Sequence, residues 1–462
     1  MCRQERTRQR VHSHLLAQLA CLGRHTLTGL LCAGGRPFAD WSADYRLYAR
    51  NRVEPAVLFD VVLQEVQRHL SPGQPMVVAM DDSILRKRGR KIPGTAWRVD
   101  PLGAPFDVSF TWAQRVIQMS VALPVDASGA ARTLPIDFVQ APTPQRPFKQ
   151  APEAVWQEYR KLRREQNINR QALLRVNRLV DVCCRQPTDH PLWLSVDGRF
   201  TNSTMLKNLP TGQVLIGRIR GDAKLHSPAA AVPTGGRPRR YGPKLPTPEQ
   251  LRTDENIPWS SVDAFAAGKR HAFRIKTISA IKWRPAGLTQ DLRLIVIAPL
   301  GYRLSKNSRK LYRKPAYLIC TDPALPVQQI LQAYLWRWGI EVNFRDEKTL
   351  IGVGQAQLRN PNSVNNQPAV SVAAYALLLA AAARAYGPNG IPDALPPPAW
   401  RSSIQPRHAS TATLINQLRY ELWAPGIVKN AFSGFMNQAP AFMKPQKLHP
   451  DLASALFYAM AG

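Results

Sequence analysis

Two short apolar runs that each end in aspartate constrain the fold of this chain most. Met76–Met80 reads Met-Val-Val-Ala-Met and is followed by Asp81, Asp82 and Ser83. Leu192–Val196 is followed by Asp197 in the same way. Runs this short and this apolar are typical of strands buried on both faces. Each of these strands would therefore present an acid at its carboxyl end.

The chain between the two runs changes character twice. Val116–Pro124 and Thr133–Val139 predict two further strands, and Asp126–Gly129 has the composition of the turn between them. A proline-rich connector then leads into a charged segment, from about Glu153 to Cys183, that predicts a long helix. Three strands, a helix and a fourth strand indicate a mixed α/β fold.

The charge of the chain points to a polyanionic partner. Lys and Arg number 62 against 31 Asp and Glu, so the net charge is +31. Such an excess favours nucleic acid, because neutralising phosphates releases condensed counterions. A solvated basic surface and binding to anionic lipid are the alternatives. Residues 211–314 hold 21 basic and 6 acidic residues (+15), and their alternating pattern predicts a basic, β-rich insertion.

Nothing in the sequence predicts a secreted or membrane protein. The six cysteines form no Cys-x-x-Cys pair, and their irregular spacing is typical of a reducing compartment. The first residues lack the apolar stretch of a signal peptide. The most apolar run, Ala369–Ala383, is short for a membrane span and precedes Arg384, so we expect a buried helix. We therefore expect a cytoplasmic, nucleoid-associated protein with no membrane partner.

The two ends of the chain predict helical regions. Residues 1–70 show apolar positions at three- and four-residue steps. They fit a structural cap and a DNA-binding bundle equally well, since no helix-turn-helix pattern is clear. Residues 386–462 begin with a proline-rich linker and end in a small helical tail.

Four polar residues near position 340 share one face of a predicted helix. Tyr334, Arg337, Glu341 and Lys348 stand at offsets 0, +3, +7 and +14. At about 100° per residue they fall at roughly 0°, 300°, 340° and 320°. A carboxylate between two cations and a phenol is an unusual stripe, and it indicates where phosphodiester chemistry could be done.

Asp81, Asp197 and Glu341 are the candidate metal ligands. Functional groups gather at the carboxyl ends of strands in open α/β folds, and carboxylates bind Mg²⁺ together with substrate phosphate. Each acid also has a simpler explanation. The two aspartates are equally typical of turns or helix caps, and Glu341 has the spacing to pair with Arg337 or Arg345.

The stripe resembles the Tyr-x2-Arg-x3-Glu-x6-Lys signature of DDE transposases from one large group of bacterial insertion sequences. All four positions match. Asp81-Asp82-Ser83 is similar to that group's first motif, and Leu194-Ser195-Val196-Asp197 is similar to its second. The 144 residues from Asp197 to Glu341 (341 − 197) resemble members with a β-strand insertion before the last helix.

This resemblance implies a ribonuclease-H-like catalytic core, formed by residues 71–210 and 315–385 and interrupted by the basic insertion 211–314. It also implies two Mg²⁺ ions, with Mn²⁺ able to substitute, held by Asp81, Asp197 and Glu341. Tyr334, Arg337 and Lys348 would grip phosphates near the transposon end. The partners implied are double-stranded DNA, both transposon ends and target, and a second copy of the chain in a synaptic homodimer.

Neighbouring acids compete with two of these assignments. Asp82 competes with Asp81, but successive strand residues point to opposite faces, and the Asp-x-Ser register favours Asp81. Asp346 and Glu347 fall near 120° and 220° on the helix, away from the stripe at about 100° per residue. A second, apolar stripe would bury this helix against the sheet: Leu331, Leu335, Trp338 and Val342.

Further DNA contacts are expected outside the stripe. The basic loop 86–91 follows Asp81 closely, so Lys87 and Arg88 are candidate phosphate contacts, although a solvated turn is the alternative. Trp259 and Trp283 in the insertion fit base stacking, but a core role is the more ordinary one for a tryptophan.

These observations predict a transposase that binds the ends of its element, hydrolyses a phosphodiester and joins the freed 3′-OH to target DNA. Two alternatives stay open. One is a non-catalytic DNA-binding protein derived from a transposase, which the presence of all three acids disfavours. The other is a ribonuclease-H-like nuclease without strand transfer, which the large basic insertion and helical ends disfavour.

Overall fold

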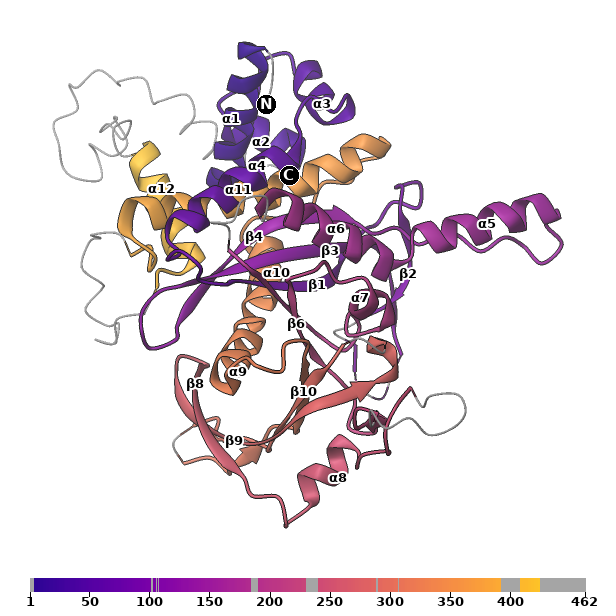
Figure 1. Cartoon of the computed structure of the whole chain (residues 1–462). Helices are drawn as coiled ribbons and strands as arrows, with labels where there is room; N and C mark the ends of the chain where they lie inside the picture. Colours follow the sequence, from indigo (N-terminus) through magenta and orange to yellow (C-terminus); the bar gives the residue numbers. More distant parts are fainter. Residues whose placement is uncertain are drawn as a thin grey trace.

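The two apolar runs that end in aspartate are neighbouring strands of one sheet. The computed structural model describes residues 4–100, 103–104, 106, 108–183, 190–229, 240–287, 290–305, 307–391 and 408–423 (Figure 1). Strand β1 spans Met76–Arg86 and strand β5 spans Leu192–Val196. They pair in parallel, with Met76 opposite Leu192 and Met80 opposite Val196.

Eleven strands within the described residues form a single mixed sheet. Their order is β2-β3-β1-β5-β6-β13-β10-β9-β7, with β4 beside β3 and β8 beside β9. β3 pairs antiparallel with both β1 and β4, whereas β5 is parallel to both β1 and β6. This arrangement is compatible with a ribonuclease-H-like core. The strands of its first half are β2 (Thr95–Val99), β3 (Phe110–Pro124), β4 (Ala131–Gln140) and β6 (Val214–Arg218).

The predicted hairpin is confirmed. Val116–Pro124 lies in β3 and pairs antiparallel with β4, which contains Thr133–Val139. Gly129, in the connecting turn, has a φ of +96°, a backbone conformation that residues other than glycine rarely adopt. The Asp-x-x-Gly composition of this turn is therefore explained by its geometry.

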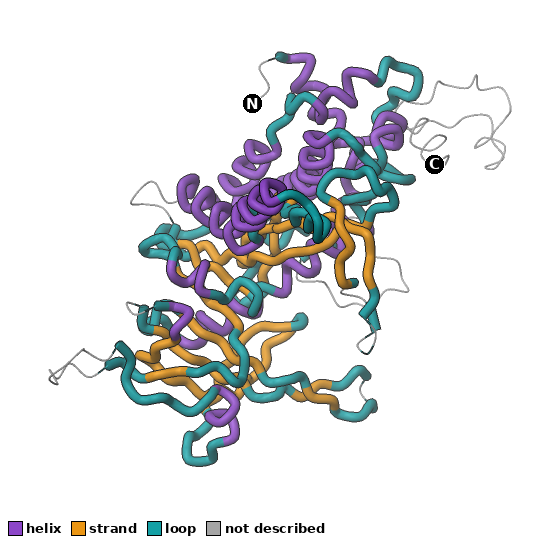
Figure 2. The backbone as a smooth tube through the Cα atoms, turned by 90° about the vertical axis from the view of Figure 1, so that its right-hand side faces the viewer, coloured by secondary structure: helices purple, strands orange, loops and turns teal. Residues whose placement is uncertain are grey.

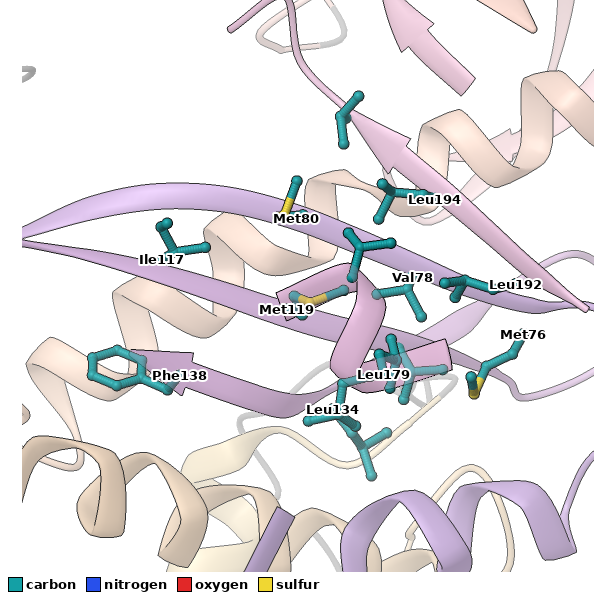
Figure 3. Close-up of a cluster of buried hydrophobic side chains, with 14 of the residues drawn as sticks. Met76, Val78, Met80, Ile117, Met119, Leu134, Phe138, Leu179, Leu192 and Leu194 are labelled. Carbon is teal, nitrogen blue, oxygen red and sulfur yellow. The ribbon is translucent and has the colours of Figure 1, made fainter. Parts of the chain in front are cut away.

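Helices cover both faces of the sheet. Side chains alternate along β1, so Met76, Val78 and Met80 share one face, where Figure 3 shows them with residues of β3, β4, β5 and α6. Helices α4 (Pro55–Arg68), α6 (Ile168–Cys183) and α11 (Pro361–Tyr386) bury apolar side chains in this cluster. The opposite face buries Val77 and Trp193 against α9 (Val327–Trp336).

The N-terminal region of the described chain contains helices that pack together. It contains α1 (Glu5–Ala20), α2 (Leu27–Ala33), α3 (Ser42–Ala49) and α4. Figures 1 and 2 show these helices gathered at one end of the molecule around α11. A cluster of buried residues from α1, α2 and α3 includes Val370 of α11. This packing fits the structural alternative, while a DNA-binding role for these helices stays a prediction.

Helix α11 is longer than the sequence pattern indicated. Asn360 caps it by accepting from the Asn362 and Ser363 N–H groups, so the helix begins at Pro361 and runs for 26 residues with Pro368 inside it. Among the described residues it is the one helix long and apolar enough to cross a membrane, so the expectation that it is too short was wrong. However, 72% of its apolar window is buried in the protein, as expected of a core helix.

The strands of residues 211–314 continue the main sheet. The segment holds β7 (Leu225–His226), β8 (Ser260–Ala266), β9 (Lys269–Trp283) and β10 (Leu292–Ile297). However, β6 lies between β5 and β13 (Ala316–Cys320), and β10 pairs with β13. The expected boundary at residue 211 is therefore corrected, since β6 belongs to the central sheet. The short helix α7 (Ser203–Lys207) precedes the segment. The segment itself also contains α8 (Pro248–Thr253), a 3-10 turn at Arg284–Ala286, and a ribbon of β11 (Gly301–Tyr302) with β12 (Leu311–Tyr312).

Two further helices complete the described chain. The helix predicted over 153–183 is broken near Asn167 into α5 (Glu153–Glu165) and α6, and α5 extends away from the body (Figure 1). Helix α12 (Thr411–Trp423) packs beside α11 and represents the predicted helical tail. Most of the predicted linker, residues 392–407, and the segment 424–462 lie outside the described residues.

The helix predicted around position 340 consists of two helices that meet at Arg337. Helix α9 ends at Trp336 and α10 spans Trp338–Thr349. The Ile340 N–H bonds to the Arg337 carbonyl, a tighter i→i+3 contact than the α-helical one. The predicted apolar stripe was therefore wrong at Trp338, which is 60% exposed, and α10 buries Ile340 and Phe344 instead.

Gly339 allows α10 to lie directly on the sheet. A Cβ added at this position would meet Thr133 Oγ1 of β4 at 1.9 Å. We expect Gly339→Ala to lower the free energy of unfolding by about 1–3 kcal/mol through overpacking, although alanine ordinarily stabilises a helix relative to glycine. Denaturant unfolding measures the change. Gly198→Ala is the control, since its methyl would meet only the Arg218 carbonyl, at 3.6 Å. Equal stability of Gly339→Ala and the wild type would contradict the close packing.

Candidate active site

The parallel pairing of β1 and β5 brings Asp81 and Asp197 together. Because Met80 lies opposite Val196, the next residue on each chain is an aspartate, and paired residues of neighbouring strands face the same side. Asp197 also forms a turn, since its Oδ1 accepts from the Arg199 N–H at 2.9 Å. Asp197 can therefore stabilise the turn through Oδ1 and still offer its second carboxylate oxygen to a ligand. The turn role and the candidate catalytic role of Asp197 do not exclude each other.

Arg337 connects Asp81 to Glu341. Its guanidinium lies 3.2 Å from Asp81 Oδ2 through Nη1 and 3.1 Å from Glu341 Oε1 through Nη2. The side chain of Arg337 is only 13% exposed, and its Cζ lies 5.7 Å from the centre of the Tyr334 ring. The predicted ion pair between Glu341 and Arg337 is thus present, and the same guanidinium holds Asp81 of β1 next to Glu341 of α10.

The three acids line one cleft of about 1230 Å³. Asp81 and Asp197 reach it from the sheet, and Glu341 and Lys348 reach it from α10. Lys348 Nζ donates to Ser83 Oγ at 2.7 Å, which ties the end of α10 to β1. The structure therefore brings together residues that lie 260 positions apart in the sequence (341 − 81).

Asp81 and Asp82 occupy opposite faces of β1. Asp81 faces α10, whereas Asp82 pairs with Arg115 Nε at 3.5 Å and with Arg199 Nε at 3.1 Å. The face shared with Asp197 and Arg337 favours Asp81 as the candidate ligand. Both aspartates line the wide cleft, but only Asp81 lies on the face that carries Arg337.

Asp346 and Glu347 do not line the cleft. Asp346 Oδ2 accepts from Thr411 Oγ1 at 2.6 Å, and Glu347 Oε1 accepts from Gln118 Nε2 at 2.8 Å. Glu347 is fully buried, and this burial raises its pKa to about 8. Both acids therefore contribute to the packing of α10 rather than to the cleft.

Lys87 is held inside the protein. Its ammonium donates to the carbonyl oxygens of Gly354 and Ala356, each at 2.8 Å, and only 7% of the residue is exposed. The expectation of a DNA contact is corrected here, because Lys87 ties the loop after α10 to the end of β1. Arg88, by contrast, is exposed at the cleft rim.

The remaining predicted residues are partly buried. Tyr334 packs against the apolar cluster beneath α9 and does not line the cleft. Trp259 and Trp283 both pack against the main core, in agreement with the ordinary role for a tryptophan. Arg274 and Lys276 lie over the Trp259 ring at 5.2 Å and 4.6 Å from its centre, so this face of the indole is already covered by cations.

The sequence pattern missed three arginines of the cleft. Arg98 of β2, Arg115 of β3 and Arg199 after β5 lie on the Asp82 side. Arg98 and Arg115 each stand in a strand among apolar or uncharged neighbours. A charged residue among the uncharged neighbours of a short stretch of strand-forming residues is the signal that could have pointed to Arg98 and Arg115.

The electrostatics of Asp81 fit a cation. Burial, and next the charge of Asp197, raise the pKa of Asp81 to about 7, against the opposing effect of Arg337. Asp81 and Asp197 repel each other, and Glu341 lines the same cleft. Carboxylate oxygens are the donors that Mg²⁺ and Mn²⁺ prefer. No three His, Cys, Asp or Glu side chains of the described residues lie in a ready-made metal cluster. The donor chemistry nevertheless fits, with Arg337 serving as the positive partner of Asp81 and Glu341.

The raised pKa of Asp81 predicts how stability depends on pH in the presence of a chelator. The folded-state pKa of about 7 exceeds the ordinary 3.8. Ionisation therefore costs the folded state more, and stability falls as pH rises from about 4 through 7. We expect Asp81→Asn to remove this fall and to gain on the order of 1–3 kcal/mol near pH 8, after allowance for partial solvent screening.

Thermal unfolding at several pH values measures this effect. Glu347 has the same sign but is present in both proteins, so the difference between them reports Asp81. The exposed Asp222 offers a control, Asp222→Asn, which should follow the wild type. A parallel pH dependence of Asp81→Asn and wild type would show that Asp81 ionises normally.

Comparison with known proteins agrees with this geometry. A family model described as DDE superfamily endonuclease matches residues 2–286, whereas no curated protein matches the chain. The matched stretch holds Asp81 and Asp197, and Glu341 lies beyond it. A nuclease of this kind has DNA as its substrate. Because the match covers more than half of the 462 residues, the chain belongs to the DDE superfamily endonucleases.

Proposed function

We propose that the protein is a DNA transposase that cuts DNA at the ends of its element and joins the freed ends to a target. One observation carries the proposal. Asp81, Asp197 and Glu341 line one cleft in a chain that belongs to the DDE endonucleases. The three acids lie within residues 71–210 and 315–385, and residues 211–314, of which β6 belongs to the central sheet, carry a net charge of +15 (21 − 6) that favours binding to DNA.

The strand order supports a ribonuclease-H-like core. β4, β3 and β1 form an antiparallel meander, and β5 and β6 follow in parallel. The first two acids follow Met80 and Val196, at the point where the parallel pairing of β1 and β5 ends. Functional groups of α/β sheets gather at such strand ends.

Asp81, Asp197 and Glu341 would hold two Mg²⁺ ions, with Mn²⁺ able to substitute. Such ions, when bound, lower the pKa of water and stabilise charge on the leaving oxygen. Arg337 keeps Asp81 and Glu341 aligned, and the Tyr334 ring supports its guanidinium. Lys348 and Arg88 face the cleft and would position the DNA backbone by contacting phosphates.

The proposed reaction has two balanced steps. In hydrolysis, water attacks the phosphorus at the element end, and the P–O3′ bond breaks to leave a 3′-OH and a 5′-phosphate. In strand transfer, that 3′-OH attacks a target phosphodiester, and a target 3′-OH leaves. Both steps exchange one P–O bond for another and need no oxidant or reductant. Two copies of the chain would hold the two ends together, on the nucleoid where this DNA lies.

Removal of the candidate ligands tests the site. We expect Asp81→Asn, Asp197→Asn and Glu341→Gln each to reduce cleavage of an element-end duplex by at least about a hundredfold. DNA binding should persist, because the basic residues remain. The duplex is taken from the sequence that flanks the gene, and nicking is followed with Mg²⁺ on a denaturing gel. Asp222→Asn should cleave like the wild type, since Asp222 is exposed beyond the cleft.

The same assay separates the alternatives when target plasmid is added. Nicking together with a joined product supports a transposase. Nicking without a joined product supports a nuclease without strand transfer. Binding without nicking by the wild type supports a non-catalytic DNA-binding protein. Full cleavage by Glu341→Gln would remove Glu341 from the proposed site.

Metal binding has a readout that does not need activity. We expect Mg²⁺ or Mn²⁺ to raise the melting temperature of the wild type by mass action, because the ions bind the folded chain. Asp81→Asn/Asp197→Asn should lose this rise, whereas Asp222→Asn should keep it. An equal rise in the double variant would place the ions elsewhere.

A further inference from the structure

A second group of charged residues lines the cleft on the other face of β1. Arg115 and Arg199 pair with Asp82, and Arg98 lies on the same side of the sheet. Three guanidinium groups and one carboxylate leave a net charge of +2 (3 − 1). These four residues, Asp82, Arg98, Arg115 and Arg199, are called the arginine cluster below.

Two arginines of the arginine cluster are built into the sheet, and Arg199 reaches Asp82 from the turn after β5. Arg98 stands opposite Thr111 in the β2–β3 pairing, and Arg115 stands opposite Ile84 in the β1–β3 pairing. Both therefore have fixed backbones, and Arg98 is only 8% exposed. Rigid strands position such groups more accurately than loops do.

The hydrogen-bonding capacity of the cluster is incompletely used. Arg98 Nη2 donates to Thr143 Oγ1 at 3.2 Å, but its buried Nε has no hydrogen-bond partner among the described residues. Arg115 Nε, also buried, lies 3.5 Å from Asp82 Oδ2, which is too far for a good hydrogen bond. Buried charged donors without acceptors are costly, so these groups indicate a missing anionic ligand.

Burial and mutual repulsion act together on these arginines. Burial, and next the charge of Arg115, lower the pKa of Arg98 to about 10, so it stays charged at neutral pH. Arg115 in turn feels the charge of Arg199 as well as that of Asp82. One carboxylate therefore leaves an excess of positive charge that a second anion would neutralise.

We propose that the arginine cluster is a phosphate-binding subsite for the DNA backbone. The ligand is a phosphodiester next to the one held beside Asp81, with Asp82 keeping the guanidinium groups in place before DNA binds. Arginine suits this task, because its planar fork matches the oxygens of a phosphate. The identity of the ligand rests on the proposed function, whereas the anion site itself rests on the contacts above.

Salt dependence of DNA binding tests the subsite. We compare Arg115→Gln/Arg199→Gln with the wild type on a short fluorescent duplex, without divalent metal, by anisotropy over a range of NaCl concentrations. Each phosphate contact adds about 0.9 to the slope of log K against log salt. We expect the double variant to lose about one unit of this slope. An unchanged slope would overturn the proposal.

Matched variants distinguish the loss of a specific phosphate contact from a change in net charge and from misfolding. Arg160→Gln/Arg384→Gln removes two exposed arginines that also pair with nearby acids, and its slope should equal that of the wild type. Arg115→Lys/Arg199→Lys keeps both charges and should retain most of the slope, which shows that a loss is not caused by misfolding. An equal loss in the Arg160 and Arg384 control would assign the effect to net charge and overturn the subsite.

The acid of the cluster gives a test of opposite sign. Asp82→Asn releases the guanidinium groups from their carboxylate, so we expect binding of the same duplex to tighten by roughly twofold or more. Weaker or unchanged binding would show that Asp82 does not compete with DNA. Both tests measure DNA binding without metal, so they remain valid even if the wild type does not cleave DNA. If the wild type cleaves DNA but these variants bind DNA unchanged, the subsite is refuted and the proposed function is not.

Discussion

The parallel pairing of β1 with β5 is the constraint on which the rest of the site depends. With Met80 opposite Val196, the two chains place their aspartates side by side as the paired region ends. A slip of one residue would turn one of the two acids to the opposite face. The apolar side chains that precede them are buried on both faces, so the register is held by the core on each side. The position of the acids is therefore a consequence of packing.

Local sequence patterns predicted the elements of this site well. Short-range periodicity, which a sequence shows directly, indicated the apolar run before Asp81, the strand before Asp197, the β3–β4 hairpin and the phase of Glu341 relative to Asp346 and Glu347. The predicted strand end at Asp81 was wrong, because β1 continues to Arg86 in its pairing with β3. The break between α9 and α10 was not predictable in this way. Next to this break, Gly339 lies against Thr133 of β4, and Trp338, which the predicted apolar stripe placed against the sheet, is 60% exposed. Such long-range contacts override local propensity.

Side-chain partners were the least predictable part of the site. Lys87 stands in a run of basic residues, and only the fold shows that the carbonyls of Gly354 and Ala356 enclose its ammonium. Arg337 was expected to face DNA and instead bridges Asp81 and Glu341. In both cases a cation satisfies a buried acceptor or acid from a distant part of the chain, because burying either group alone is costly. The sequence shows the charge but not the partner.

The alternation of side chains along β1 separates two tasks that would otherwise conflict. Carboxylates that attract cations repel a DNA backbone, and arginines that attract the backbone would compete for those carboxylates. Asp81 and its neighbour Asp197 lie on one face of the strand, whereas Asp82, Arg98 and Arg115 lie on the other. Because successive side chains of a strand point to opposite faces, one backbone segment holds both groups apart while keeping them within one cleft. A protein with a net charge of +31 can therefore place acids on one face of a strand and keep the arginines proposed to bind DNA on the other.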